Sequence, residues 1–207
     1  GFEAAEFLKL REVIKKLFPL MTEKAELRIL GDDAYLYKIK GRDESRNVMV
    51  MSHHDVVDAT GDWQEEPFAG VIRDGKLWGR GTVDTKTPLF AEFSAIEELL
   101  GEGFEFPVNT YLFSSHNEEY GGDGALLALD YFNENNIKFE WIMDEGGAII
   151  DPPMAGISKR CAMMAVHEKG RCTAQLTASS KPGHAGLEGG HKTPVMRMVA
   201  FMAETDE

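Results

Sequence analysis

Residues 48–55 read VMVMSHHD, a compact apolar run that ends in two histidines and an aspartate. The run is typical of a buried strand. Two further strand-like segments, residues 109–114 and 139–143, also lead directly into polar clusters, and helical patterns lie between the three segments. Strands that alternate with helices predict a parallel or mixed sheet. In such sheets ligands bind beyond the carboxyl ends of the strands, so we expect a functional site there.

The pattern around this core predicts an α/β protein. Apolar residues at helical spacing predict three helices, over residues 4–18, 89–100 and 125–133. Residues 34–40 alternate in polarity as a strand does, and an Asp-Gly pair predicts a hairpin within residues 68–78. We therefore expect a mixed, mostly parallel sheet flanked by helices.

The pattern changes after residue 153. The predicted elements beyond it are a hairpin of residues 160–167 and 171–179, a glycine-rich loop over 182–190 and a helix from residue 193. We expect a domain boundary near His167. Residues 1–167 would then form a first domain, and residues 168–207 would begin a second one.

Charge and composition limit the kinds of partner and the cellular location that we expect for this chain. The chain has 22 Lys and Arg against 35 Asp and Glu, a net charge of −13, which argues against a nucleic-acid partner. No apolar run reaches the ~18 residues of a membrane span, and residues 1–10 do not resemble a signal peptide. Two cysteines make no disulfide framework, so we expect a reducing, cytoplasmic location.

The polar clusters suggest a metal site. They contain His53 and Asp55, Asp84, Glu118 and Glu119, and Asp144. Taken singly, an aspartate after a strand is more often a turn or a helix cap than a ligand. Gathered at one edge of a sheet, however, these carboxylates would repel one another unless cations neutralised them. Carboxylates and neutral imidazole are ligands that suit zinc.

The spacing within the clusters distinguishes residues that can bind metal from residues that can orient a ligand or act as a general base. His53 and Asp55 lie on one side of an extended segment, so Asp55 can accept the second ring proton of His53. His54 alternates with His53 and is expected to point away. Glu118 and Glu119 point in different directions, so one can bind metal while the other remains a general base.

These residues and their neighbours resemble the signature blocks of the dinuclear zinc aminoacylase/carboxypeptidase metallopeptidase family. That family includes acetylornithine deacetylase, succinyl-diaminopimelate desuccinylase, carboxypeptidase G and carboxypeptidase S. The similar stretches, in the family's order, are SHHDVV at 52–57, DGKLWGRGTVDTK at 74–86, NEEYGG at 117–122, DEGG at 144–147 and GHA at 183–185. The DEG and WGRG forms favour carboxypeptidase S-like members.

The resemblance implies that residues 1–167 form a zinc-peptidase-like catalytic domain that binds metal, and that residues 168–207 are the incomplete beginning of a smaller α+β lid domain. It also implies a set of metal ligands. His53, Asp84 and Asp144 would hold one zinc ion. Asp84 would bridge to a second zinc ion, which Glu119 would also bind. Cobalt or manganese could replace zinc.

The resemblance also implies catalytic roles. Glu118 would be the general base that activates a metal-bound water, and Asp55 would orient His53. His184 matches the family's lid histidine, which helps to bind the tetrahedral intermediate. In dimeric members that histidine reaches the partner subunit's active site, so a homodimer through the lid domain is one option.

The implied reaction is hydrolysis of an amide bond next to a free carboxylate, in a small peptide or an N-acyl amino acid. The enzyme would be a carboxypeptidase, a dipeptidase or an N-acyl-amino-acid deacylase.

Family members continue to a further histidine ligand, so we expect these 207 residues to be an N-terminal fragment, weak or inactive alone. The alternative is a non-catalytic metal-binding or interaction module that keeps the peptidase fold. One departure from the family pattern is Asn117, where an aspartate is usual.

Overall fold

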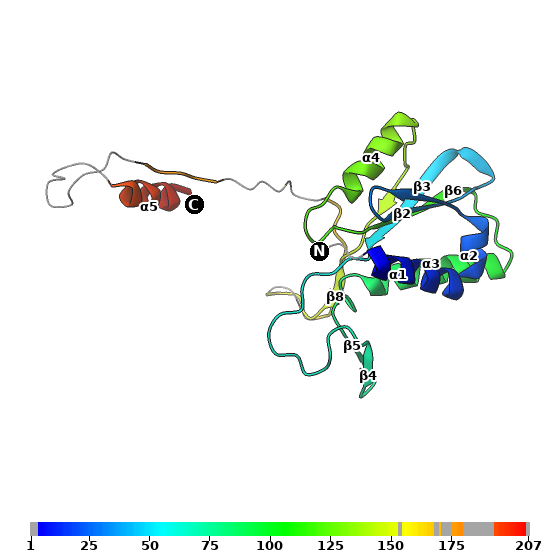
Figure 1. Cartoon of the computed structure of the whole chain (residues 1–207), viewed down its shortest axis with the longest axis horizontal. Coiled ribbons are helices and arrows are strands. Elements are labelled where there is room, and N and C mark those ends of the chain that lie inside the picture. The colour runs from blue at the N-terminus through cyan, green and yellow to red at the C-terminus, as the bar shows by residue number, and fades with distance from the viewer. Residues whose placement is uncertain (1–3, 153–154, 168–169, 171–174, 180–192, 206–207) are drawn as a thin grey trace. The chain divides into compact units, whose positions relative to one another are not determined.

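The fold is described from a computed structural model, over residues 4–152, 155–167, 170, 175–179 and 193–205. The chain divides into two compact units, Gly1–Met164 and Ala165–Glu207. The first unit holds the sheet and most of the helices (Figure 1).

The central sheet has five strands in the order β1-β2-β6-β3-β7. Their bounds are Glu26–Leu30 for β1, Ala34–Ile39 for β2, Asp43–His53 for β3, Val108–Ser115 for β6 and Ile142–Met143 for β7. β1 with β2 and β2 with β6 are antiparallel, whereas β3 is parallel to both β6 and β7. The prediction of a mixed α/β sheet is confirmed, but the expectation that it is mostly parallel is wrong, because two pairings are antiparallel and two are parallel.

Helices cover both faces of this sheet (Figure 1). The first unit contains α1 (Ala4–Leu17), α2 (Pro19–Lys24), α3 (Lys86–Gly101) and α4 (Gly124–Glu134). Because side chains alternate along a strand, Tyr35 and Tyr37 of β2 pack in one core with α1, α2 and α3. Leu36 packs in the other core, with Phe132 of α4. β6 lies between these layers, and all eight of its residues are buried.

Two elements at the start of the chain were missed from the sequence. The first helix ends before Pro19 as predicted, but Pro19 then begins the short helix α2, where its missing N–H is no disadvantage. The carboxylate of Glu97 on α3 accepts the backbone N–H groups of Leu20 and Met21 at 3.0 and 2.8 Å. The start of α2 is therefore stabilised by a residue far away in the sequence. The other missed element is β1.

Two smaller pairs of strands complete the unit. β4 (Val71–Arg73) and β5 (Lys76–Trp78) form the predicted hairpin, and Asp74 and Gly75 adopt the positive φ angles of 53° and 71° that such a turn requires.

The predicted hairpin of residues 160–167 with 171–179 is corrected by the structure. β9 (Cys161–Met163) instead pairs with the preceding strand β8 (Ala148–Ile150). An exposed ion pair of 3.0 Å between Arg160 and Asp151 lies next to this pairing. Residues 175–179 form no strand, and residues 171–174 lie outside the described part of the chain.

The second unit contains α5 (Pro194–Thr205) among its described residues. The assignment of residues 168–207 to a lid domain, with a boundary near His167, stays a prediction. Among the described helices of the chain, none combines the length and the apolar character needed to cross a membrane.

Candidate metal centre

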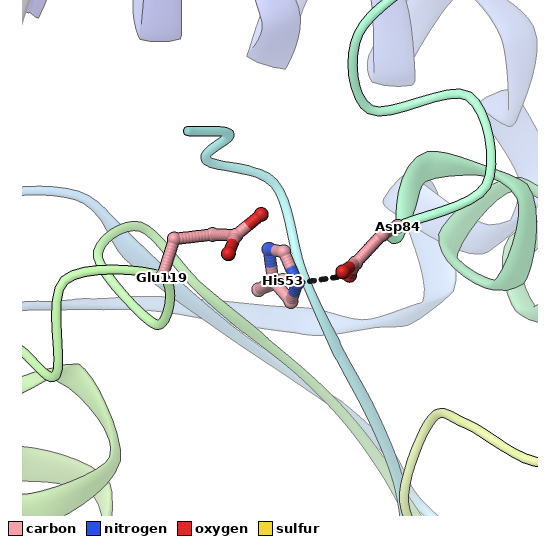
Figure 2. Close-up of side chains that lie close together, drawn as sticks. All are labelled: His53, Asp84 and Glu119. Carbon is pink, nitrogen blue, oxygen red and sulfur yellow. Dashed lines mark hydrogen bonds and ion pairs between the residues drawn. The ribbon is translucent and has the colours of Figure 1, made fainter. Parts of the chain in front are cut away.

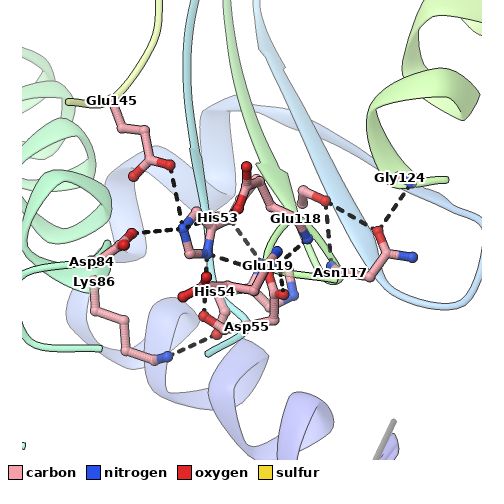
Figure 3. A network of polar contacts seen from close by, with 12 residues as sticks. His53, His54, Asp55, Asp84, Lys86, Asn117, Glu118, Glu119, Gly124 and Glu145 are labelled. Carbon is pink, nitrogen blue, oxygen red and sulfur yellow. Dashed lines mark hydrogen bonds and ion pairs between the residues drawn. The ribbon is translucent and has the colours of Figure 1, made fainter. Parts of the chain in front are cut away.

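The carboxyl ends of β3 and β6 meet at one edge of the sheet (Figure 3). The two strands are parallel and in register, with His53 opposite Ser115. The backbone N–H of His54 donates to the carbonyl of Ser115 at 2.9 Å, which continues the pairing past the end of β3. Residues 53–55 and 116–119 therefore emerge side by side, as expected for the ends of parallel strands.

Asp55 joins these two segments. Its carboxylate oxygens accept the backbone N–H groups of Glu118 and Glu119, each at 3.1 Å. One of the same oxygens lies 3.3 Å from Nδ1 of His53. Burial alone would raise the pKa of Asp55, but the His53 hydrogen bond and the two backbone donors outweigh it and lower that pKa. Asp55 therefore stays ionised and directs the opposite ring nitrogen, Nε2, away from itself.

Several carboxylates converge on Nε2 of His53. Asp84 Oδ1 lies 3.0 Å away, Glu145 Oε1 3.3 Å and Glu118 Oε2 3.8 Å. Figure 2 shows the imidazole ring between the side chains of Asp84 and Glu119. The His53 side chain is 1% exposed, whereas that of Asp84 is 69% exposed. The cluster thus has a buried nitrogen donor and oxygen donors that reach solvent.

The carboxylates also set the charge of His53. Burial disfavours its protonated form, but the hydrogen bond to Asp55, the charge of Glu145 and the hydrogen bond to Asp84 together raise its pKa to about 9. In the metal-free protein the imidazolium form is therefore favoured at neutral pH. A proton and a metal cation would therefore compete for the same nitrogen, Nε2.

The donor chemistry of the cluster fits a divalent cation. Ligand atoms that lie within 4.8 Å of one another belong to two sets, His53 with Asp84 and Glu119, and His53 with Glu118 and Glu145. Imidazole nitrogen with carboxylate oxygen is a combination that zinc accepts. Burial, followed by the charges of neighbouring carboxylates, raises the pKa values of Glu118 and Glu145. A cation would relieve that repulsion.

The loop before α3 brings Asp84 to the cluster. The backbone N–H of Lys86 donates to the carbonyl of Gly81 at 2.9 Å, and its ammonium donates to the carbonyl of His54 at 2.8 Å. Gly81 has a φ of +81°, and a Cβ there would lie 2.5 Å from Val56 and 3.2 Å from the Lys86 ammonium. Glycine is therefore needed at this position. Sequence reasoning missed Lys86, although it lies only two residues after Asp84.

The fourth cluster differs from the sequence prediction. Glu145, which was not singled out, contacts His53, whereas a carboxylate oxygen of Asp144 accepts the backbone N–H of Glu145 at 2.8 Å. Asp144 is exposed and belongs to neither set of converging ligand atoms. Its role as a ligand stays a prediction. His184 lies outside the described residues.

His54 lies on the opposite side of the end of β3. Its ring stacks on Tyr35 at 4.3 Å and meets the edge of Phe7 at 5.1 Å. Its Nδ1 lies 2.8 Å from Oγ of Ser114. Burial, above all other causes, lowers its pKa to about 3, so His54 is neutral. The prediction that His54 points away from the cluster is confirmed.

The chain thus combines a mixed α/β sheet with a histidine and carboxylates gathered at its strand ends. Residues 49–196 match the Peptidase family M20/M25/M40, and the chain belongs to this family.

Two relatives illustrate this membership. The chain is 37% identical over 188 residues to "Probable carboxypeptidase S-like 2" of Dictyostelium discoideum, covering 88% of this chain and 36% of that protein. It is 33% identical over 181 residues to "N-fatty-acyl-amino acid synthase/hydrolase PM20D1" of Xenopus tropicalis, covering 85% and 35%. The chain therefore spans roughly a third of the length of these relatives.

Solved structures show the same fold. An M20 family metallo-carboxypeptidase, Sso-CP2 from Sulfolobus solfataricus, is 30% identical with a TM-score of 0.55, over 70% of this chain and 32% of that one. Human carnosine dipeptidase 1 has a TM-score of 0.58 at 20% identity, over 70% and 34%, and supports the fold alone.

Proposed function

We propose that the protein containing this chain hydrolyses an amide bond next to a free carboxylate, in a small peptide or an N-acyl amino acid. The observation that carries this proposal is the convergence of Asp84, Glu118 and Glu145 on Nε2 of His53. The names of the relatives describe a probable carboxypeptidase S-like protein and an N-fatty-acyl-amino acid synthase/hydrolase. Both activities cut an amide on the amino side of an amino acid.

The proposed site holds two divalent cations, with zinc as the first choice. His53, Asp84 and Asp144 would hold one ion, and Asp84 and Glu119 the other. Glu145 is a further candidate because it contacts His53. When bound, such ions supply Lewis acidity, which polarises the scissile carbonyl and makes water more acidic. We expect about two zinc ions per chain in the full protein.

Glu118 is proposed as the general base. Its backbone N–H is held by Asp55, and its side chain is 56% exposed, so the carboxylate can reach a substrate. Burial and neighbouring carboxylates raise its pKa, which makes it a better proton acceptor near neutral pH. Glu118 would take a proton from the attacking water and deliver it to the leaving amine.

His184 and the lid domain remain part of the proposal on the strength of the resemblance. A donor imidazole aimed at the developing oxyanion would stabilise the transition state. If it acts across a homodimer, mixing inactive His184→Ala subunits with inactive Glu118→Gln subunits should restore part of the activity. An unrestored hybrid dimer would rule out the cross-subunit role.

The test is Glu118→Gln in the full-length, metal-loaded protein, assayed on a panel of dipeptides and N-acyl amino acids. Loss of a general base typically reduces the rate by about 10²–10⁴-fold, and we expect kcat to fall by that much with metal content unchanged. Glu134→Gln, at an exposed position of α4, is the matched control. Near-normal turnover of Glu118→Gln would refute the assignment. A wild-type protein that binds metal but hydrolyses nothing would favour the non-catalytic module.

A further inference from the structure

The turn that carries Glu118 and Glu119 is held from two sides (Figure 3). On one side the carboxylate of Asp55 accepts both of their backbone N–H groups. On the other side lies Asn117, which connects the end of β6 to the start of α4. Any shift of this turn would move both the proposed base and a proposed metal ligand.

The side chain of Asn117 uses both ends of its amide. Its Oδ1 accepts the backbone N–H of Gly124 at 3.1 Å and the hydroxyl of Ser115 at 3.3 Å. Its Nδ2 donates to Oδ1 of Asp123 at 3.0 Å. A side chain at Gly122 would collide with this amide. The half-buried amide therefore packs against the turn on one side, and its hydrogen bond to the exposed Asp123 lies at the surface.

The side chain of Asp123 makes a hydrogen bond that is unusual for the N-cap residue of a helix. It is the N-cap residue of α4, where an aspartate commonly accepts a backbone N–H of the first turn. Here its side chain makes no capping hydrogen bond within the described residues, and Asn117 instead accepts the N–H of Gly124. The carboxylate of Asp123 serves as the acceptor for Asn117, so the two side chains have exchanged the expected roles.

We propose that Asn117 and Asp123 form a matched donor–acceptor pair that positions the Glu118-Glu119 turn for metal binding and catalysis. The inference rests on the proposed function of that turn. A carboxylate at residue 117 has no N–H to donate and would place two negative charges in contact with each other. An aspartate at residue 117 would therefore lose the hydrogen bond that Asn117 donates to Asp123. Asn117 and Asp123 act as positioning residues, since neither needs to touch the substrate.

The test is an exchange of the two side chains, measured in the full-length protein. Asn117→Asp alone should weaken zinc binding and lower kcat, each by about 10–100-fold, the range found when partners of metal ligands are removed. KM should change little, because the substrate contacts are untouched. Asp123→Asn alone keeps an acceptor for Asn117 and should have a small effect. The double variant Asn117→Asp/Asp123→Asn restores a donor–acceptor pair and should recover both zinc affinity and kcat.

Asn133→Asp adds the same charge at an exposed position of α4 and should change neither quantity. The proposal is overturned if Asn117→Asp lowers only the melting temperature, or if the double variant recovers neither zinc affinity nor kcat. Should Asn117→Asp fail to fold, the double variant still decides: wild-type zinc affinity supports the pair, and an unfolded or metal-free protein refutes it. If zinc affinity follows the expected pattern but no variant hydrolyses the panel, the proposed function fails and the pair stands.

Discussion

The two sides of the end of β3 shift the pKa values of two neighbouring histidines in opposite directions. On the carboxylate side, formed by Asp55, Asp84 and Glu145, the pKa of His53 is raised to about 9. On the aromatic side, formed with Tyr35 and Phe7, the pKa of His54 is lowered to about 3. Both rings are buried and adjacent in the chain. Their chemistry therefore comes from the side of the strand on which each one lies.

The contrast separates a binding site from a core position. The carboxylate side gathers negative charge that a proton can offset and a metal cation can offset more fully. The aromatic side holds a neutral imidazole by stacking and by one polar contact with Ser114. We expect changes on the first side to alter metal binding, and changes on the second side to alter stability.

The largest expected difference comes from replacing each histidine in turn. His53→Ala removes the buried nitrogen ligand and should lower zinc affinity by more than the 10–100-fold typical of losing an indirect partner. His54→Phe preserves the stacking on Tyr35 and should leave zinc affinity within about threefold of wild type. Calorimetric titration with zinc after chelator treatment measures both. If zinc affinity fell equally in the two variants, the proposed difference between the two sides of β3 would be wrong.

The second prediction concerns the pH dependence of zinc binding. Because zinc and a proton compete for Nε2 of His53, and its metal-free pKa is about 9, zinc binding below pH 9 must displace that proton. Affinity should therefore rise by about tenfold between pH 7 and 8 and by about fivefold between pH 8 and 9, as the pH approaches that pKa. Competition against a chromophoric chelator of known pH behaviour gives the slope. A flat profile would show that His53 is neutral without metal.

The third prediction distinguishes the two acidic residues of the fourth cluster. The charge of Glu145 is among the leading causes that raise the pKa of His53, so Glu145→Gln should lower that pKa by more than Asp144→Asn does. Proton NMR titration of the metal-free protein can follow the imidazole. Zinc titration of the same two variants then shows which carboxylate binds metal, with an expected loss of about tenfold or more for a true ligand. A pKa that does not respond to Glu145→Gln would contradict the observed contact.

The smallest expected effect concerns stability in acid. The folded-state pKa of His54 lies below the ordinary value of 6.5, so its stabilising contribution is complete above pH 6.5 and is lost as pH falls towards 3. Glu92 has the opposite sign. Burial raises its pKa to about 7, so protonation increasingly stabilises the fold as pH falls from 7 towards 4.5.

The comparison must therefore be made between variants. As the pH falls from 6.5 to 5.5, the free energy of unfolding should decrease in wild type by about 1 kcal/mol more than in His54→Phe. Urea unfolding at several pH values measures the difference, with Glu92 common to both proteins. Parallel curves would mean that His54 is not held neutral by the aromatic side.

Much of the fold follows from local pattern. The apolar runs at β3 and β6 and the helical spacing of α3 and α4 were readable because each segment is long and strongly periodic. β1 and α2 were missed because they are short, and because α2 begins where Glu97 of a distant helix caps it. The pairing of β9 with β8 also depends on contacts outside the segment itself.

The sequence by itself determined the family, the order of the polar clusters and the residue types available to bind a cation. Strand alternation even assigned His53 and His54 to opposite sides. Only the tertiary structure decided which side chains meet: Glu145 at the imidazole, Lys86 against the carbonyl of His54, and Asn117 paired with Asp123. The physical reason is that these contacts are set by strand register and turn geometry, which bring together groups that a linear spacing cannot relate.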